Sequence, residues 1–390
     1  MEKILSVVLV LIFTSAVHSE IKDAFDYYSS NSNYNKSFNE VLPLAERGDP
    51  EAQNMLGMMY LLGEGVKKDN KEAYKWYLKA AKQDDTHAEY VLGGIYFGGK
   101  VVKQNYQEAH KWYLKAAEKG YVDAEYAVGV MYDTGTGVSK DYKESHKWYL
   151  KAAKQGHIEA EYMLGAMYDV GQNVKQDYQK AYKWYLKSAE QGHVKAQKQL
   201  GTLYQLGQGV KQDWQETHKW YLKAAKQGDI FSQYLLGTMY FKGQGVRQDY
   251  QEARKWFLEA AKQGHVKAQN TLGKWYFYGG KGAKQDDLEA YKWILNAAKQ
   301  GNAEAESMLG TMYYFGKGVE IDYQEARKWL LKAAEQSNSA AAQYVLGQIY
   351  ARGKGVRQNK ISAKEWYGKA CDGGAQLACD EYRKLNEQGD

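Results

Sequence analysis

Histidines are the residues of this sequence best suited to acid–base chemistry or metal binding, and six of them recur at fixed intervals. His110, His146 and His218 are separated by multiples of 36 residues, and His157, His193 and His265 follow the same spacing. If 36 residues make one unit of two packed helix layers, about 8–10 Å per layer, neighbouring copies lie too far apart to share a metal ion. We therefore expect these histidines to be surface residues of a repeat.

Other residue types give no stronger signal for catalysis. Asp133 and Asp169 also lie 36 residues apart, so the same distance argument excludes them as a pair of catalytic carboxylates. The sequence has no glycine-rich phosphate loop and no Cys/His spacing typical of zinc. We expect no catalytic residues, no metal site and no cofactor.

The interval of 36 residues dominates the whole chain, with two slips to 37. One glycine column and one tryptophan column define it, and nine of the 11 tryptophans belong to the second. The glycines are Gly57, Gly93, Gly129, Gly165, Gly201, Gly237, Gly273, Gly310 and Gly347; the tryptophans are Trp76, Trp112, Trp148, Trp184, Trp220, Trp256, Trp293, Trp329 and Trp366. An internal repeat of this length predicts stacked units that share one core.

Each unit contains the signals of two helices, A and B. In the first unit, helix A is predicted over 50–62, and the Gly63-Glu64-Gly65 turn ends it. Helix B is predicted to begin at Asp69, with Glu72 three residues later in the spacing of a capping box. The fold class is therefore all-α, with about nine helix-turn-helix repeats of 36 residues.

Comparison of the copies within the chain predicts which face of helix A is free for binding. The positions of Asn54, Met58, Leu61 and Leu62 change freely, whereas the opposite arc stays small or apolar. Two rows of aromatic residues on this variable arc are the candidate ligand-binding groove. They are Tyr90, Tyr126, Tyr162, Tyr234 and Tyr344 in one row, and Phe97, Phe241, Phe277 and Tyr314 in the other. The alternative is that these rings pack against the next repeat.

The repeat resembles the Sel1-like repeat family, a relative of tetratricopeptide repeats, over about residues 35 to 385. The resemblance implies a right-handed α/α superhelical solenoid that serves as a protein-interaction scaffold, with no shared catalytic residues. The sixth unit carries the motif as Leu236-Gly237-Thr238-Met239-Tyr240 followed by Asp249-Tyr250-Gln251-Glu252-Ala253.

The two cysteines resemble the Cys-x7-Cys pair of cysteine-rich Sel1-like proteins. That resemblance implies a disulfide between Cys371 and Cys379, and the alternative is two free buried thiols. It also raises a cell-envelope hydrolase of the β-lactamase type as an alternative function. A serine enzyme of that type needs Ser-x-x-Lys. This spacing occurs at Ser19-Glu20-Ile21-Lys22, and no Lys-Thr-Gly follows it.

The N-terminus has the features of a signal peptide. Lys3 precedes an apolar run from Ile4 to Phe13, which is too short to span a bilayer of about 30 Å, and small residues follow it up to Ser19. We expect cleavage after Ser19 and export to the bacterial periplasm or medium; a weakly cleaved anchor is the alternative. The predicted organisation is signal peptide 1–19, linker 20–34, capping helix 35–48, nine repeats 49–374, and a closing helix with a tail 375–390.

Composition narrows the class of partner. Two prolines and 14% aromatic residues argue against a disordered chain. The net charge is +6, but many of the recurring lysines have a glutamate three residues away that can partly neutralise them. We expect a monomeric, exported scaffold that binds a protein or peptide along helix A. An anionic cell-envelope glycan remains an alternative partner, and export argues against nucleic acid. A secreted factor directed at a host protein would use the same groove.

Overall fold

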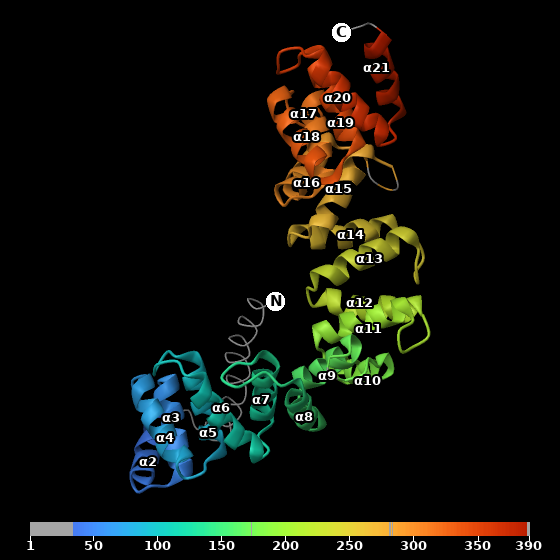
Figure 1. Ribbon diagram of the computed structural model, residues 1–390. Coiled ribbons are helices and arrows are strands. Elements are labelled where there is room, and N and C mark those ends of the chain that lie inside the picture. The colour runs from blue at the N-terminus through green and yellow to red at the C-terminus, as the bar shows by residue number, and fades with distance from the viewer. Residues whose placement is uncertain (1–33, 173, 281, 283, 388–390) are drawn as a thin grey trace. The chain divides into compact units, whose positions relative to one another are not determined.

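The computed structural model describes residues 34–172, 174–280, 282 and 284–387, and these residues form 20 α-helices and no β-strand. The predicted signal peptide and most of the predicted linker lie outside the described residues. The chain divides into two compact units, Met1–Ala196 and Gln197–Asp390. In each unit, successive helices pack as antiparallel pairs (Figure 1).

The first unit contains one single helix followed by four A/B pairs. Helix α2 continues through Pro43, although a proline inside a helix is expected to shorten or kink it. The helices are α2 (Tyr34–Glu46), α3 (Pro50–Leu62), α4 (Asn70–Ala81), α5 (Thr86–Gly98), α6 (Tyr106–Glu118), α7 (Val122–Thr134), α8 (Tyr142–Lys154), α9 (Ile158–Val170) and α10 (Tyr178–Glu190).

The second unit repeats the pattern and ends on a single closing helix. Helix α11 (Val194–Leu206) begins in the last residues assigned to the first unit. The others are α12 (Trp214–Lys226), α13 (Ile230–Lys242), α14 (Tyr250–Lys262), α15 (Val266–Tyr278), α16 (Asp287–Lys299), α17 (Ala303–Phe315), α18 (Tyr323–Ser337), α19 (Ala340–Arg352), α20 (Lys360–Asp372) and α21 (Gln376–Glu387).

Helix B is capped by one side chain rather than by a full capping box. The Asp69 carboxylate accepts hydrogen bonds from the backbone N–H groups of Lys71 and Glu72, at 2.8 and 3.1 Å. The Glu72 carboxylate does not return the bond, because it pairs with Lys75 Nζ at 2.6 Å. The Asp69 N–H donates instead to the Tyr60 carbonyl of helix A at 2.9 Å, which ties the two helices of the unit together.

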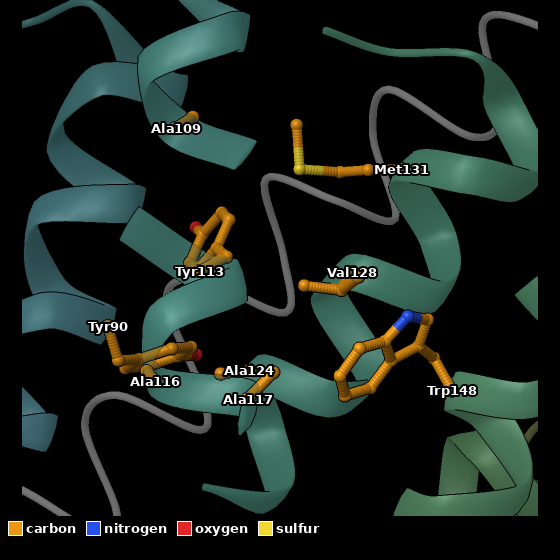
Figure 2. Packing of buried hydrophobic residues seen from close by; sticks show 9 residues of the cluster. All are labelled: Tyr90, Ala109, Tyr113, Ala116, Ala117, Ala124, Val128, Met131 and Trp148. Carbon is orange, nitrogen blue, oxygen red and sulfur yellow. The ribbon is translucent and has the colours of Figure 1, made fainter. Parts of the chain in front are cut away.

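The glycine column exists because a large side chain of helix B lies directly on helix A, an aromatic ring in seven repeats and Ile294 or Leu330 in the other two. A Cβ atom at Gly93 would lie 2.5 Å from Cδ1 of Tyr113, a distance that side chains cannot adopt. Tyr113 is only 1% exposed and packs with Val128 and Met131 of α7 (Figure 2). The same column holds Tyr77, Tyr149, Tyr185 and Tyr221, which are among the most deeply buried large side chains of the described chain.

The tryptophan column lies nearer the surface than the tyrosine column. Trp76, Trp148 and Trp220 are buried, but a lysine four residues or fewer away covers the ring. Lys79 Nζ, for example, lies 3.7 Å from the ring centroid of Trp76. These tryptophans therefore close the outer side of the core, and the recurring lysines stabilise them by cation–π contacts.

A buried Glu or Gln on helix A forms a third column that links the two helices of one unit. Gln191 Nε2 donates to Glu161 Oε2 at 2.7 Å, and Gln263 Nε2 donates to Gln233 Oε1 at 2.8 Å. In the second repeat the pair is ionic, with Lys119 Nζ 2.9 Å from both carboxylate oxygens of Glu89. Each bond joins the end of helix B to the first turn of helix A in the same unit and so satisfies a buried polar group.

Candidate functional site

The nine aromatic candidates of the predicted groove are all buried or half-buried. Tyr90, Tyr126 and Tyr314 are 5%, 7% and 3% exposed. The remaining six, Phe97, Tyr162, Tyr234, Phe241, Phe277 and Tyr344, are half-buried. Their rings pack on neighbouring aromatic side chains, which matches the alternative of packing within the solenoid and leaves them little surface for a ligand.

The tyrosine row packs beneath the residue that caps the following helix A. Tyr126 stacks on His157 with ring centroids 4.4 Å apart, and Tyr162 lies 4.7 Å from His193. His157 Nδ1 in turn accepts a hydrogen bond from the backbone N–H of Ala160 at 3.2 Å. The ring therefore supports a helix cap, and His157, His193 and His265 have a structural role at helix N-termini.

The second aromatic row packs against helix B of the same unit. Phe97 lies 5.1 Å from Tyr106, and Phe241 lies 5.5 Å from Tyr250. These are edge-to-face contacts, which stabilise the turn that joins helix A to helix B. The two rows thus contribute mainly to the repeat fold.

The helix-B histidines also have structural partners, contrary to the expectation of free surface residues. His146 Nε2 and His218 Nε2 lie 3.1 and 3.0 Å from the hydroxyl groups of Tyr168 and Tyr240 in the next helix A. Burial lowers the pKa of both imidazoles, and Lys180 lowers that of His146 further. In the described residues no group of three or more His, Cys, Asp or Glu side chains could hold a metal ion.

The face of helix A that reaches solvent is rotated from the predicted one. It is formed by the positions of Glu51, Met55, Met58 and Leu62, which recur at helical spacing on one side. The two middle positions are half-buried in most repeats, and Met58 and Val130 are buried. We call these four positions in each helix A the helix-A face. The first and last positions are mostly exposed, as at Phe231 and Tyr278, which are 60% and 72% exposed. Asn54 and Leu61, by contrast, begin the two packed rows.

In the first four repeats the charged residues of the helix-A face are acidic. Glu51 of α3, Asp123 of α7 and Glu159 of α9 occupy the first position, and no lysine or arginine occupies any of the four positions in α3, α5, α7 and α9. Two of these acids lie against the capping His157: Asp123 Oδ1 is 3.3 Å from its Nε2, and Glu159 Oε2 is 3.8 Å from its Nδ1.

In the second unit the same face is basic and carries exposed apolar side chains. The change begins at Lys195, the first position of α11, and the lysines of the face in α13 and α15 are Lys242, Lys267 and Lys274. Its exposed apolar residues are Leu206, Phe231, Tyr278 and Phe315, at 59%, 60%, 72% and 55%. The sequence analysis missed this reversal of charge. A comparison of the charges at the first and last positions of the helix-A face in all nine repeats would have found it.

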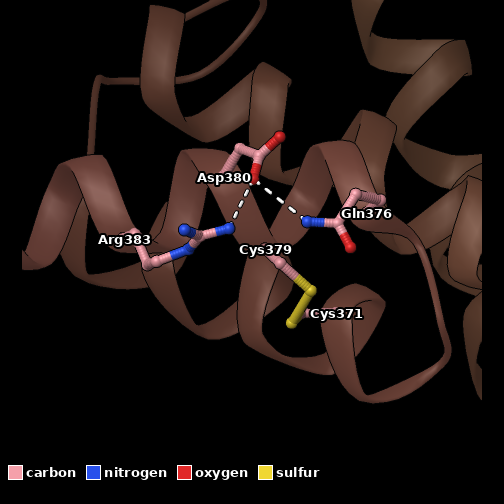
Figure 3. Close-up of a disulfide and its surroundings, with 5 residues drawn as sticks. All are labelled: Cys371, Gln376, Cys379, Asp380 and Arg383. Carbon is pink, nitrogen blue, oxygen red and sulfur yellow. Dashed lines mark hydrogen bonds and ion pairs between the residues drawn. A yellow bond between two sulfur atoms is a disulfide. The ribbon is translucent and has the colours of Figure 1, made fainter.

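The two cysteines form a disulfide at the end of the second unit. Cys371 of α20 and Cys379 of α21 are bonded, with their Cα atoms 4.7 Å apart (Figure 3). Beside the bond, Asp380 accepts hydrogen bonds from Arg383 at 2.6 Å and from Gln376 at 3.2 Å. The disulfide and this cluster hold the closing helix, which has a packing neighbour on one side only.

Tandem helical hairpins that share a continuous core define an α/α solenoid repeat protein. The Sel1 repeat model matches nine consecutive segments of the chain: 50–85, 86–121, 122–157, 158–193, 194–229, 230–265, 266–302, 303–338 and 340–374. The chain therefore belongs to the Sel1 repeat family, whose members are generally non-enzymatic scaffolds for protein interactions.

Solved structures show the same fold over most of the chain. A protective antigen present in uropathogenic Escherichia coli strains is 33% identical, with a TM-score of 0.59, and the match covers 90% of each chain. A Sel1 repeat protein from Oxalobacter formigenes is also 33% identical, with a TM-score of 0.63, over 79% of this chain and 88% of that one. A search of curated proteins found no match. No described helix is both long and apolar enough to cross a bilayer.

Proposed function

We propose that this protein is an exported scaffold that binds an extended segment of a partner protein on its helix-A face. One observation carries the proposal. The core columns keep nearly the same residue in every repeat, as in Leu164, Leu200 and Leu236. The first and last positions of the helix-A face, by contrast, are solvent-exposed in most repeats, and they change in charge and in apolar character from one unit to the other. Packing does not dictate these exposed residues, so they can vary to fit the surface of a partner.

The exposed apolar side chains support a protein partner in particular. Phe231, Tyr278 and Phe315 are large side chains that stay open to water, and such residues often mark interaction surfaces. Aromatic residues gain much contact area at a small entropic cost when a partner covers them. Lysines at neighbouring positions would then position the partner's acidic groups.

The compartment of the partner is part of the proposal. The signal-peptide pattern of residues 1–19 supports export, and the likeness to a protective antigen of uropathogenic strains supports a protein that is met outside the cytoplasm. A partner in the periplasm and a partner on a host cell would both use the helix-A face.

Site-specific cross-linking tests the proposal. Tyr278 is replaced by a photoreactive p-benzoylphenylalanine and the protein is irradiated in the native envelope fraction and, separately, in an extract of host cells. The control carries the same residue at Leu288, which is 55% exposed but lies at the start of helix B. We expect a discrete adduct from position 278 alone. Adducts of equal yield from position 288, or none from position 278 in either fraction, would contradict the proposal.

A further inference from the structure

We infer that the helix-A face of the second unit binds an acidic protein segment whose single large apolar side chain enters a pocket between α13 and α15. This inference rests on the proposed function and adds the chemistry of the partner. Three observations lead to it: an apolar pocket, a surplus of positive charge around it, and an exposed aromatic residue, Tyr278, in its wall.

The pocket has a volume of about 370 Å³ and lies on the helix-A side of the hairpins. It is lined by Phe241 of α13 and by Thr271, Lys274, Trp275, Tyr278 and Gly279 at the C-terminal end of α15. Pockets of this kind take an anchor side chain when their walls are apolar and their polar groups are few.

Trp275 is the residue that makes this repeat different from the others. Its position is occupied by Met239 in the preceding repeat and by Met312 in the following one. The indole is 7% exposed and meets the ring of Phe241 edge to face, with centroids 5.5 Å apart. Its Nε1–H already donates to the Gly280 carbonyl at 3.1 Å, so the ring offers the pocket an apolar surface.

Two wall residues of the pocket carry a hydroxyl group, Thr271 and the largely exposed Tyr278. The Thr271 hydroxyl donates to the Lys267 carbonyl at 2.7 Å within α15. Tyr278 is 72% exposed and therefore free to close over an inserted side chain. An aromatic or branched aliphatic anchor suits this environment. A charged anchor would lose its hydration, and the lysine in the wall, Lys274, is already paired with Glu304.

The charge around the pocket is positive and only partly compensated. On the helix-A face of α13, α15 and α17, three lysines (Lys242, Lys267 and Lys274) stand against one acid, Glu304, which leaves a surplus of two positive charges. Lys274 Nζ pairs with Glu304 Oε1 at 2.6 Å, and Asn270 donates to the other oxygen at 2.6 Å. Among the described residues, no carboxylate lies within ion-pair distance of Lys242 or Lys267.

Acidic residues on both sides of the anchor would meet these two exposed lysines. Lys242 ends α13 and Lys267 lies near the start of α15, and both are exposed. Charge complementarity of this type raises the rate of association and sets specificity, and salt weakens it. The surface therefore fits an extended acidic segment rather than a basic one.

Fluorescence anisotropy with synthetic peptides tests the inference on the full-length mature protein. The probe is a fluorescein-labelled heptapeptide with one phenylalanine among aspartates, and the comparison peptides replace the phenylalanine by serine or the aspartates by lysines. We expect the phenylalanine peptide to bind about tenfold more tightly than the serine peptide, and the lysine peptide not to bind. Raising salt from about 50 to about 500 mM should weaken binding.

Variants locate the binding to this pocket. Thr271→Trp fills the pocket and should abolish the preference for phenylalanine over serine. Tyr278→Ser is a surface change that should reduce the same preference, and it provides the test if Thr271→Trp does not fold. K242Q/K267Q should weaken the acidic peptide about three- to tenfold, whereas K226Q/K299Q removes the same charge from helices α12 and α16 and should change little. Equal effects of the two lysine pairs, or tighter binding of a single-stranded oligonucleotide, would overturn the inference.

The outcome separates this inference from the proposed function. If the peptide does not bind but position 278 still cross-links a protein, the scaffold function stands and the acidic partner is wrong. If position 278 yields no adduct, the proposed function fails whatever the peptide does.

Discussion

The imidazole of His265 lies stacked on the phenol ring of Tyr234, with centroids 4.6 Å apart and planes inclined by 29°. Its Nδ1 accepts a hydrogen bond from the Ala268 N–H at 3.2 Å and so caps α15. This bond requires an unprotonated Nδ1. Burial lowers the pKa of His265, and the positive charge of Lys267 lowers it further. A neutral ring is therefore part of the folded repeat.

The capping histidine predicts a pH dependence with a defined sign. Because the pKa of His265 is lower in the folded state than its ordinary value of about 6.5, its contribution to stability is present above about pH 6.5 and is lost as the pH falls below it. Asp229 caps α13 at the equivalent position, accepting the Ser232 N–H at 2.7 Å. His265→Asp should keep the cap and lose less stability than the wild type between about pH 7.5 and 5.5.

Thermal unfolding followed by circular dichroism at both pH values checks this prediction. His265→Ala serves as the control that lacks a cap; it should be less stable than the wild type by about 1 kcal/mol at about pH 7.5, and this difference should shrink at about pH 5.5, where the wild type loses its cap. An equal acid-induced loss in the wild type and in His265→Asp would show that the cap does not titrate.

Two glycines of α5 predict opposite effects of the same substitution. Gly93→Ala places a Cβ against the Tyr113 ring and should lower stability by about 1–3 kcal/mol. At Gly98 the added Cβ meets nothing within 4 Å, so Gly98→Ala should be neutral or slightly stabilising. Chemical denaturation of both variants tests the contrast; similar midpoints would argue against ring packing as the reason for the glycine column.

The buried column of Glu and Gln predicts another contrast. Burial raises the pKa of Glu161, while Lys187 and the bond from Gln191 lower it in part. Glu161→Gln keeps a partner for Gln191 and removes a buried charge, so it should stabilise the protein by about 0.5–1 kcal/mol at pH 7. This gain should shrink at about pH 5, because protonation then neutralises Glu161 itself.

Glu89→Gln should have the opposite effect. Glu89 is fully buried and paired with Lys119, so its removal leaves the ammonium only the more distant, exposed carboxylate of Asp84 at 3.4 Å and should cost about 1–2 kcal/mol. Differential scanning calorimetry of the two variants side by side decides the matter. A stabilising Glu89→Gln would show that the ion pair is no better than the amide pairs of the other repeats.

The disulfide predicts a local effect at the end of the second unit. Reduction of Cys371–Cys379 should destabilise the closing hairpin by about 2–3 kcal/mol, because the bond restricts the unfolded chain between α20 and α21. Hydrogen exchange of the α21 amides should then accelerate while α13 and α14 stay protected. Uniform acceleration in all helices would mean that the bond supports the fold globally.

The fold could be predicted largely from the sequence because each position of the repeat occurs nine times in the chain, so the residues that it requires can be recognised. The Gly57 and Trp76 columns, the Gly63 turn and the Asp69 cap all have direct structural counterparts. The disulfide agrees with the resemblance to cysteine-rich relatives. Period and capping residues are local signals, and in a solenoid local signals determine most of the architecture.

The exposed face of helix A was harder to predict because variation between copies has more than one cause. The position of Tyr126 and Tyr162 differs between repeats, and there the ring packs on the histidine that caps the next helix A. The positions of Phe231 and Tyr278 also differ between repeats, but their side chains are exposed. Successive residues of a helix lie about 100° apart around its axis, so an error of one position moves the predicted exposed face by about that angle. The sequence alone did not determine which side of helix A faces solvent. Replacing Tyr126 by serine would therefore test stability rather than binding.

The most direct test of the central claim compares two pairs of exposed apolar residues in the second unit. The partner recovered through position 278 is titrated against F231S/Y278S, on the helix-A face, and against L288S/I321S, which lies outside it; all four side chains are 55–72% exposed. The account predicts a loss of affinity of about tenfold or more for the first pair alone, with both variants as helical as the wild type. Unchanged affinity of F231S/Y278S, or an equal loss in L288S/I321S, would contradict it.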